Sequence, residues 1–275
     1  MLRTQCTGVH WELSLVRRVY VAAVQIEGDM IAVEPLIRDW LKDAEQRDDR
    51  EAIVTHLLGL GYCHLCRDEP EHIPQLLARL EQLVGDDHSG SFNLVWIEAI
   101  TLCYEEAGVP ALAGALSRLR LMHRSAHGRV LLYRVWSRGY ESRVLSALAA
   151  ATTGKARLRW LGELRRLRQQ LLAESWHYAT SLAKNIEATL AWFSADRDAA
   201  ARALTESAEL SGQSGARLFA AVARLASAQV RGDEAMRAEA TAALEALNVV
   251  DGVRMARAHL PAFWSPHDGA LALVQ

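Results

Sequence analysis

Four amphipathic runs within the range Ser175–Asn248 constrain the fold of this chain more than any other feature. Apolar residues recur there at three- and four-residue steps, as in the range Trp176–Phe193, which is the pattern of one helical face. Polar turns separate the runs at 194–196, after Gly212, where we expect a positive φ, and at Gly232. A single helical hairpin cannot bury its apolar face, so two consecutive hairpins predict a stack. In each pair the first helix carries the bulky residues, and we expect it to be the more buried one.

The same pairing extends back toward the N-terminus. Turn-forming residues that divide the two helices of a pair recur every 36 to 46 residues, at Gly28, Asp68, Gly108, Gly154, Asp196 and Gly232. No run alternates as a β-strand would. The sequence therefore predicts an all-α fold, a right-handed α-solenoid of about six tetratricopeptide-like (TPR-like) hairpins over residues 1–250. A C-terminal capping helix and tail occupy 251–275, and we expect 262–264 to fold back over the final pair.

Composition and length indicate a globular chain. Of its 275 residues, 51% are hydrophobic and 23% are charged. No apolar run approaches the roughly 18 residues needed to span a bilayer, and no apolar segment of a signal peptide follows Arg3. Four cysteines are too few for a disulfide framework in a chain of this length. We expect a cytoplasmic protein with reduced thiols, no membrane contact and no cofactor.

Charge is unevenly distributed along the chain. Between residues 27 and 110 there are 18 acidic and 6 basic residues, whereas 13 basic residues between 118 and 168 face only Glu141 and Glu163. One interpretation is a solvated basic face, partly neutralised by the acidic first half. Another is an acidic or phosphorylated protein partner, because arginine suits bidentate recognition of anions. Nucleic acid is the least favoured partner, since the isoelectric point is near 6.6 and no nucleic-acid-binding motif is present.

Stacks of helical hairpins commonly bind peptides on the concave side, which the first helix of each pair lines. Arg134 and Arg138 are four residues apart and share one face of such a helix, and Lys184 and Asn185 lie on the next first helix. These four are the predicted partner-binding residues.

Two segments carry a resemblance to a known family. Cys6–Leu13 (CTGVHWEL) is similar to the opening of a family region, and Ala243–Asp251 (ALEALNVVD), followed by Arg254–Arg257 (RMAR), is similar to its closing signature. The chain thus resembles the C-terminal TPR-like region of large bacterial serine/threonine protein kinases and of related ATPase-linked regulators. The resemblance implies a scaffolding or regulatory module of bacterial signalling, either as a fragment of a longer protein or as a separate relative.

The sequence lacks the catalytic motifs that such kinases use. It has no glycine-rich phosphate loop, no His-Arg-Asp and no Asp-Phe-Gly, and also no Walker A or His-Glu-x-x-His motif. An all-α enzyme would need carboxylates or histidines that converge on one cavity, which the sequence does not indicate. We therefore predict a non-catalytic protein–protein interaction module. The alternative is a peptide or small-molecule sensor that uses the same concave groove.

One cysteine cluster is a candidate for metal or redox chemistry. Cys63 and Cys66 form a CxxC on one helix face, His72 is close in sequence, and Cys103 occupies the place in the third pair that Cys63 has in the second. A structural zinc usually has four ligands held by tight turns, whereas small thiols are common core residues. We favour buried structural thiols here and predict no metal.

Two further motifs have simpler interpretations. The pairs Asp48-Asp49 and Asp86-Asp87 lack the third carboxylate of aspartate-rich metal motifs and fall in predicted turns. Ser211–Gly215 lacks the spacing and the strand of a nucleophile elbow, so we interpret it as a loop between helices.

Overall fold

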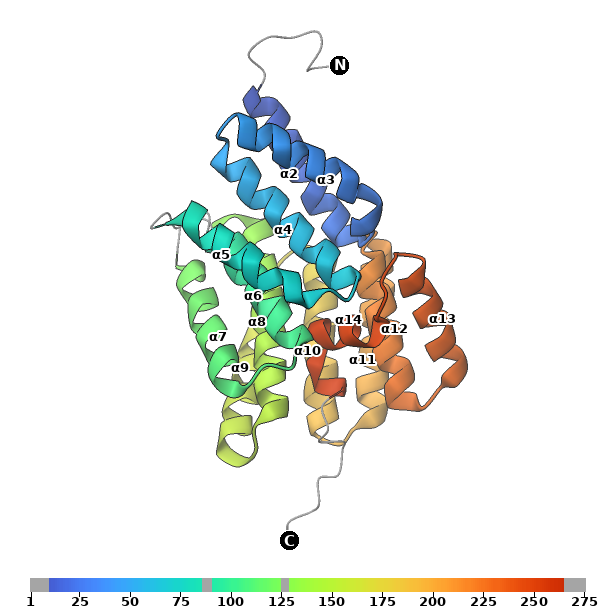
Figure 1. The fold of residues 1–275 in the computed structure, drawn as a ribbon. Coiled ribbons are helices and arrows are strands. Elements are labelled where there is room, and N and C mark those ends of the chain that lie inside the picture. The colour runs from blue at the N-terminus through green and yellow to red at the C-terminus, as the bar shows by residue number, and fades with distance from the viewer. Residues whose placement is uncertain (1–9, 86–90, 125–128, 265–275) are drawn as a thin grey trace.

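The computed structural model describes residues 10–85, 91–124 and 129–264 of the chain. Every regular element in these stretches is helical, which confirms the predicted all-α class for this part of the chain (Figure 1). Three sequence predictions lie outside the described residues: positions 6–9 of the opening family segment, the Asp86-Asp87 pair, and the tail after residue 264.

The helices follow one another in pairs. The first helices are α2 (His10–Glu27), α4 (Arg50–Cys66), α6 (Ser91–Tyr104), α8 (Leu131–Ala151), α10 (His177–Phe193) and α12 (Arg217–Arg231). The second helices are α3 (Met30–Gln46), α5 (Ile73–Val84), α7 (Val109–His123), α9 (Gly154–Leu172), α11 (Arg197–Gln213) and α13 (Glu234–Glu245). A 3₁₀ turn, η1 (Pro70–His72), precedes α5, and the described chain closes with α14 (Gly252–His259) and η3 (Pro261–Phe263).

Left-handed residues divide the helices where the sequence predicts. Positive φ occurs within two residues of each predicted dividing position, at Gly28, Asp68, Glu106, Gly154, Ala195 and Gly232. An aspartate next to such a residue often caps the following helix, because its carboxylate accepts a backbone N–H of the first turn. Asp49, which follows Asp48 with φ +53°, caps α4 in this way, so this acidic pair has a structural role in a turn. The expected end at Gly212 is wrong, because α11 continues to Gln213 and the positive φ is at Gly215.

From α4 onward the first helix of each pair is more buried than the second, as the sequence predicts, whereas α2 keeps several large apolar residues exposed. In α8 nearly every residue from Val135 to Ala150 is buried, because α6, α7, α9, α10 and η3 all pack on it. The neighbouring α9 buries one stripe of leucines, Leu161, Leu164, Leu167 and Leu171. Each buried leucine contributes about 1.5–3 kcal/mol. The first helices from α4 onward therefore form the interior of the molecule.

The first and last pairs meet in space. The turn residue Gly28 has φ +106°, and a Cβ added there would lie 2.3 Å from the Cβ of Leu218 in α12. Arg217 donates to Glu27 at 3.0 Å beside this contact. Only glycine fits this position, since the backbone conformation and the close approach both exclude a side chain. The pairs consequently curl until α12 lies against α2 (Figure 1).

The C-terminal segment lies inside the curl of helices. We call residues 250–263 the C-terminal strap. The Val250 N–H donates to the Cys66 carbonyl at 2.8 Å, and Arg254 and Arg257 pair with Asp68 and Glu106. A helix is present in the predicted place, but α14 packs between α6 and α12, and η3 reaches α8 and α10 (Figure 1). The strap does fold back onto the final pair, at α12, but it packs equally on the inner side of the stack, where η3 lies mainly against α8 and α10.

None of the helices in the described stretches is long and apolar enough to cross a lipid bilayer.

Candidate functional site

A cavity of about 440 Å³ opens between α2, α4, α6 and α8. We call it the inner groove. It is lined at the N-terminal ends of α4, α6 and α8, by residues 50–58, 92–96 and 132–136, whereas the strap contacts the C-terminal ends of α4 and α6. The inner groove and the strap thus lie at opposite ends of α4 and α6, which together with α8 we call the inner helices.

Helix α2 forms an apolar wall of the inner groove. Leu15, Val19, Ala22 and Ile26 line it at four- and three-residue steps, so they share one helical face. Leu15 is 38% exposed and Val19 60% exposed, although both are large aliphatic residues. Val21, on the same helix, is buried in the core. Helix α2 therefore has apolar residues on the core side and on the groove side.

The floor of the inner groove is aromatic. The Trp96 ring lies 5.3 Å from Trp136 in an edge-on arrangement and stacks on Tyr133 at 5.9 Å, measured between ring centres. It also stacks on Tyr140 at 5.6 Å. Packed aromatic rings have few accessible rotamers and offer large apolar area, which is why they dominate binding hot spots. The floor is suited to receive an apolar side chain.

Polar donors remain unpaired beside this floor. The Nε1 atoms of Trp96 and Trp136 and the Nε2 atom of Gln25 are buried and have no hydrogen-bond partner among the described residues. A second cavity of about 20 Å³, roughly the room for one water molecule, shares Gln25 and Trp136 with the groove and extends to Arg143. The groove therefore combines an apolar surface with donors at its base.

Arg143 is a buried cation at the inner end of this second cavity. Arg143 is 5% exposed, and its Nη1 atom has no hydrogen-bond partner in the described part of the chain. The guanidinium lies 4.6 Å from the Tyr140 ring centre and 5.5 Å from that of Phe219, so aromatic faces surround its charge. Burial, together with the charge of Arg143, lowers the pKa of His259 in the strap well below its ordinary value.

The four predicted partner-binding residues do not line the inner groove. Arg134 donates to both carboxylate oxygens of Glu174 at 2.7 and 2.8 Å, and Arg138 donates to the same carboxylate at 2.6 Å. These hydrogen bonds, that of Arg134 foremost, lower the pKa of Glu174. Lys184 pairs with Glu187 and with Glu206 across to α11.

The fourth residue, Asn185, lies elsewhere. It lines a cavity of about 10 Å³ beside Arg143 and His259. Its Oδ1 is buried and has no partner among the described residues. Of the four predicted residues, Arg134 and Arg138 come together, and Lys184 and Asn185 lie apart from them in separate surroundings.

Much of the basic run at 118–168 is neutralised by nearby glutamates. Arg120 pairs with Glu141 and Glu163, and Arg168 pairs with Glu187. Hydrogen bonds from His123 and Arg120 outweigh burial and hold the pKa of Glu141 below its usual value. The predicted neutralisation by the acidic first half is seen at Arg118, which pairs with Glu98.

The cysteines in the described residues are buried free thiols. The Cys63 thiol donates to the Met30 carbonyl at 3.4 Å. Burial raises the pKa of Cys66 and of Cys103 to about 12, and that of Cys63 higher still. A thiol of such high pKa is a poor nucleophile at neutral pH. These thiols are packed as core residues, which the sequence interpretation favours.

Comparison with protein-family models, with curated proteins and with solved structures finds no match.

The sequence of α2 contains a signal for the inner groove that the predicted partner-binding residues do not include. From Leu13 to Ile26, helix α2 is apolar on almost every side, whereas an amphipathic outer helix has one polar face. A helix with apolar residues on several sides has more apolar surface than one packing partner covers, which indicates an exposed apolar patch.

Proposed function

We propose that the inner groove binds an apolar helical segment of a partner protein and that the chain is a non-catalytic interaction module. One observation carries this proposal. The inner helices are filled at one end by the chain's own amphipathic helix, and at the other end they surround an open groove with an aromatic floor. An apolar surface of this size in a folded chain is typical of a binding site.

The strap indicates what kind of segment these helices accommodate. Helix α14 buries Met255, Ala258 and His259, which are three and four residues apart, against α6 and α12. Its arginines pair with acidic residues at the margin. Helical ligands of grooves commonly use such anchors with polar residues at the rim. We infer that the partner segment has aliphatic or aromatic anchors at this spacing and contacts the Arg18–Glu51 pair at the groove edge.

We extend this proposal to the architecture and the cellular role of the whole chain. The paired helices are those of a right-handed TPR-like solenoid that is closed on itself by its first and last pairs. The chain then acts as a cytoplasmic adaptor in bacterial signalling, the role that the resemblance to the helical region of serine/threonine kinases implies. An acidic or phosphorylated partner remains a prediction. The cations that would contact it, Arg134, Arg138 and Lys184, pair with glutamates of the chain itself.

Site-specific photocross-linking tests the groove directly. A photoreactive amino acid at Val19, in the groove wall, is compared with the same residue at Leu158 on α9, which is 65% exposed and outside the groove. We expect a partner cross-linked from position 19 alone, through an amphipathic helix that mass spectrometry identifies. A synthetic peptide of that helix then binds the wild type, and binding is lost in Leu15→Glu/Val19→Glu but kept in Leu158→Glu. Equal cross-linking from both positions, or peptide binding that survives Leu15→Glu/Val19→Glu, contradicts the proposal.

A small-molecule sensor is the second candidate, because the groove volume falls in the range of about 300–1,000 Å³ that is typical of ligand pockets. Native mass spectrometry of the purified chain distinguishes it. A bound small molecule that is absent from Leu15→Glu/Val19→Glu, without a cross-linked protein, favours the sensor.

A further inference from the structure

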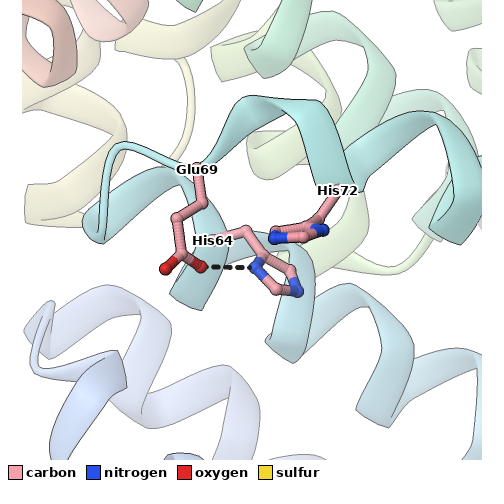
Figure 2. A group of neighbouring side chains, drawn as sticks. All are labelled: His64, Glu69 and His72. Atoms are coloured by element: carbon pink, nitrogen blue, oxygen red, sulfur yellow. Dashed lines mark hydrogen bonds and ion pairs between the residues drawn. The ribbon is translucent and has the colours of Figure 1, made fainter.

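Two histidines and a glutamate come together where α4 passes into α5. His64 lies in the last turn of α4, Glu69 in the connection and His72 in η1, and the three side chains converge on one side of the turn (Figure 2). His64 Nδ1 is 3.0 Å from Glu69 Oε2, and the His64 and His72 ring centres are 4.9 Å apart. One ligand atom from each residue lies within 4.8 Å of the other two.

The backbone of this turn is held by its own hydrogen bond and by contacts with α6 and the strap. Asp68 has φ +60°, which reverses the chain so that the Glu69 N–H donates to the His64 carbonyl at 2.9 Å. The Asp68 carboxylate accepts from Tyr104 at 2.9 Å and pairs with Arg254 of the strap. This double attachment holds the backbone from which the three side chains project, which lowers the entropic cost of binding a ligand there.

The surroundings leave the cluster free for a cation. The nearby Arg67 is paired with the buried Glu34, which neutralises its charge. His72 is exposed, and within the described stretches its imidazole contacts the His64 ring and has no hydrogen bond. The thiol of Cys63, one residue before His64, instead donates to a backbone carbonyl in the core. The available donors are thus imidazole nitrogen and carboxylate oxygen.

We propose that His64, Glu69 and His72 bind a divalent transition-metal cation, for which Zn²⁺ is the best fit. Two imidazoles and one carboxylate are a ligand set that zinc uses when a fourth position stays open for water or another donor. Calcium and magnesium are disfavoured, because they prefer oxygen ligands throughout. The metal joins the end of α4 to the start of α5 and so stabilises the turn on which the strap docks.

Zinc titration of the full chain tests this site. By isothermal titration calorimetry we expect one Zn²⁺ per chain in the wild type, with affinity lowered about tenfold or more in His72→Ala and in Glu69→Gln. His177→Ala, which removes an exposed histidine from α10, is the matched control and keeps wild-type affinity. Circular dichroism without metal shows whether each variant is folded. No zinc binding by the wild type, or equal affinity in His72→Ala and His177→Ala, overturns the proposal.

Cobalt identifies the ligand atoms independently. Co²⁺ in an imidazole–carboxylate site has weak d–d absorption without the strong charge-transfer band of a thiolate ligand, and His72→Ala should remove that absorption. A thiolate band would place the metal on cysteine and overturn the proposal as well. Both experiments leave the inner groove intact, so their failure does not bear on the proposed function.

Discussion

The two ends of the inner helices have the same architecture but differ in what covers them. At the C-terminal ends, the strap buries Phe263 to 2% exposure and places its ring 5.6 Å from Trp192. At the N-terminal ends, Val19 of the inner groove stays 60% exposed beside an aromatic floor. The comparison indicates that an apolar surface on these helices can be buried by another helix that packs on it. Among the described residues, the chain supplies that helix at the C-terminal ends.

The largest expected effect comes from removing the central anchor of the filled end. Phe263→Ala should lower the free energy of unfolding by about 3–5 kcal/mol, because it leaves a cavity against Trp192. Val19→Ala at the open end should change it by about 0.5 kcal/mol or less, since that side chain is already in water. Urea denaturation of both variants measures the contrast. Similar losses in the two variants would mean that the ends do not differ in the way described here.

A smaller effect should distinguish the filled end by its response to pH. His259 is buried against Arg143 of α8 and Phe219 of α12, and both of its ring nitrogens lack partners among the described residues. Its folded-state pKa is lowered, so the unfolded chain binds a proton below about pH 6.5 that the folded chain does not. Its contribution to stability is complete above that pH and is lost progressively as the pH falls.

Hydrogen exchange measures this loss. We expect the protection factors of residues 252–263 to fall between about pH 7 and about pH 5.5 in the wild type. In His259→Leu the decline should be shallower, because no imidazole has to be charged there. His56, whose pKa burial lowers to about 4, is present in both proteins and cancels in the comparison. An equal decline in the two proteins would exclude His259 as the titrating group.

A third effect concerns the attachment of α8 to the segment after α9. Arg134 and Arg138 attach the first turns of α8 to Glu174, and Arg134→Glu/Arg138→Glu should cost about 1–3 kcal/mol by breaking this network. Arg165→Glu/Arg166→Glu, on exposed positions of α9, is the control and should change stability little. Because the pKa of Glu174 is lowered, the loss should be full at neutral pH and shrink as the carboxylate is protonated below about pH 4. Thermal denaturation at both pH values measures it, and equal melting temperatures in the two double variants would show that the network is dispensable.

Local signals made the helix pairs predictable. Positive-φ turns at Gly28, Gly154 and Gly232 and capping aspartates such as Asp233 depend on a few adjacent residues, so their sequence pattern is sufficient. The asymmetry between α12, which is buried along most of its length, and α13, which buries only Ala240 and Leu244, could likewise be predicted, since the first helix of that pair carries the bulkier residues.

The surroundings of the candidate residues could not be predicted, because they depend on distant partners or on the conformation of one turn. The engagement of Arg134 and Arg138 is set by Glu174, which lies 40 and 36 positions away from them, respectively. The cysteine motif directed attention to the thiols, but the turn of Asp68 brings His64, Glu69 and His72 together on the other side. Nothing in the composition of α8 marks Arg143 as the one of its arginines that enters the core.

The contact of Gly28 with Leu218 has a consequence for how such a molecule folds and evolves. An open array of repeats can gain or lose terminal units readily, because each unit contacts only its neighbours and unfolding can start at either end. Here residues 190 positions apart in the chain must meet, so the first and last pairs become neighbours of each other. Unfolding should therefore be a single cooperative transition. Duplication or loss of a helix pair would break the contact between the first and last pairs.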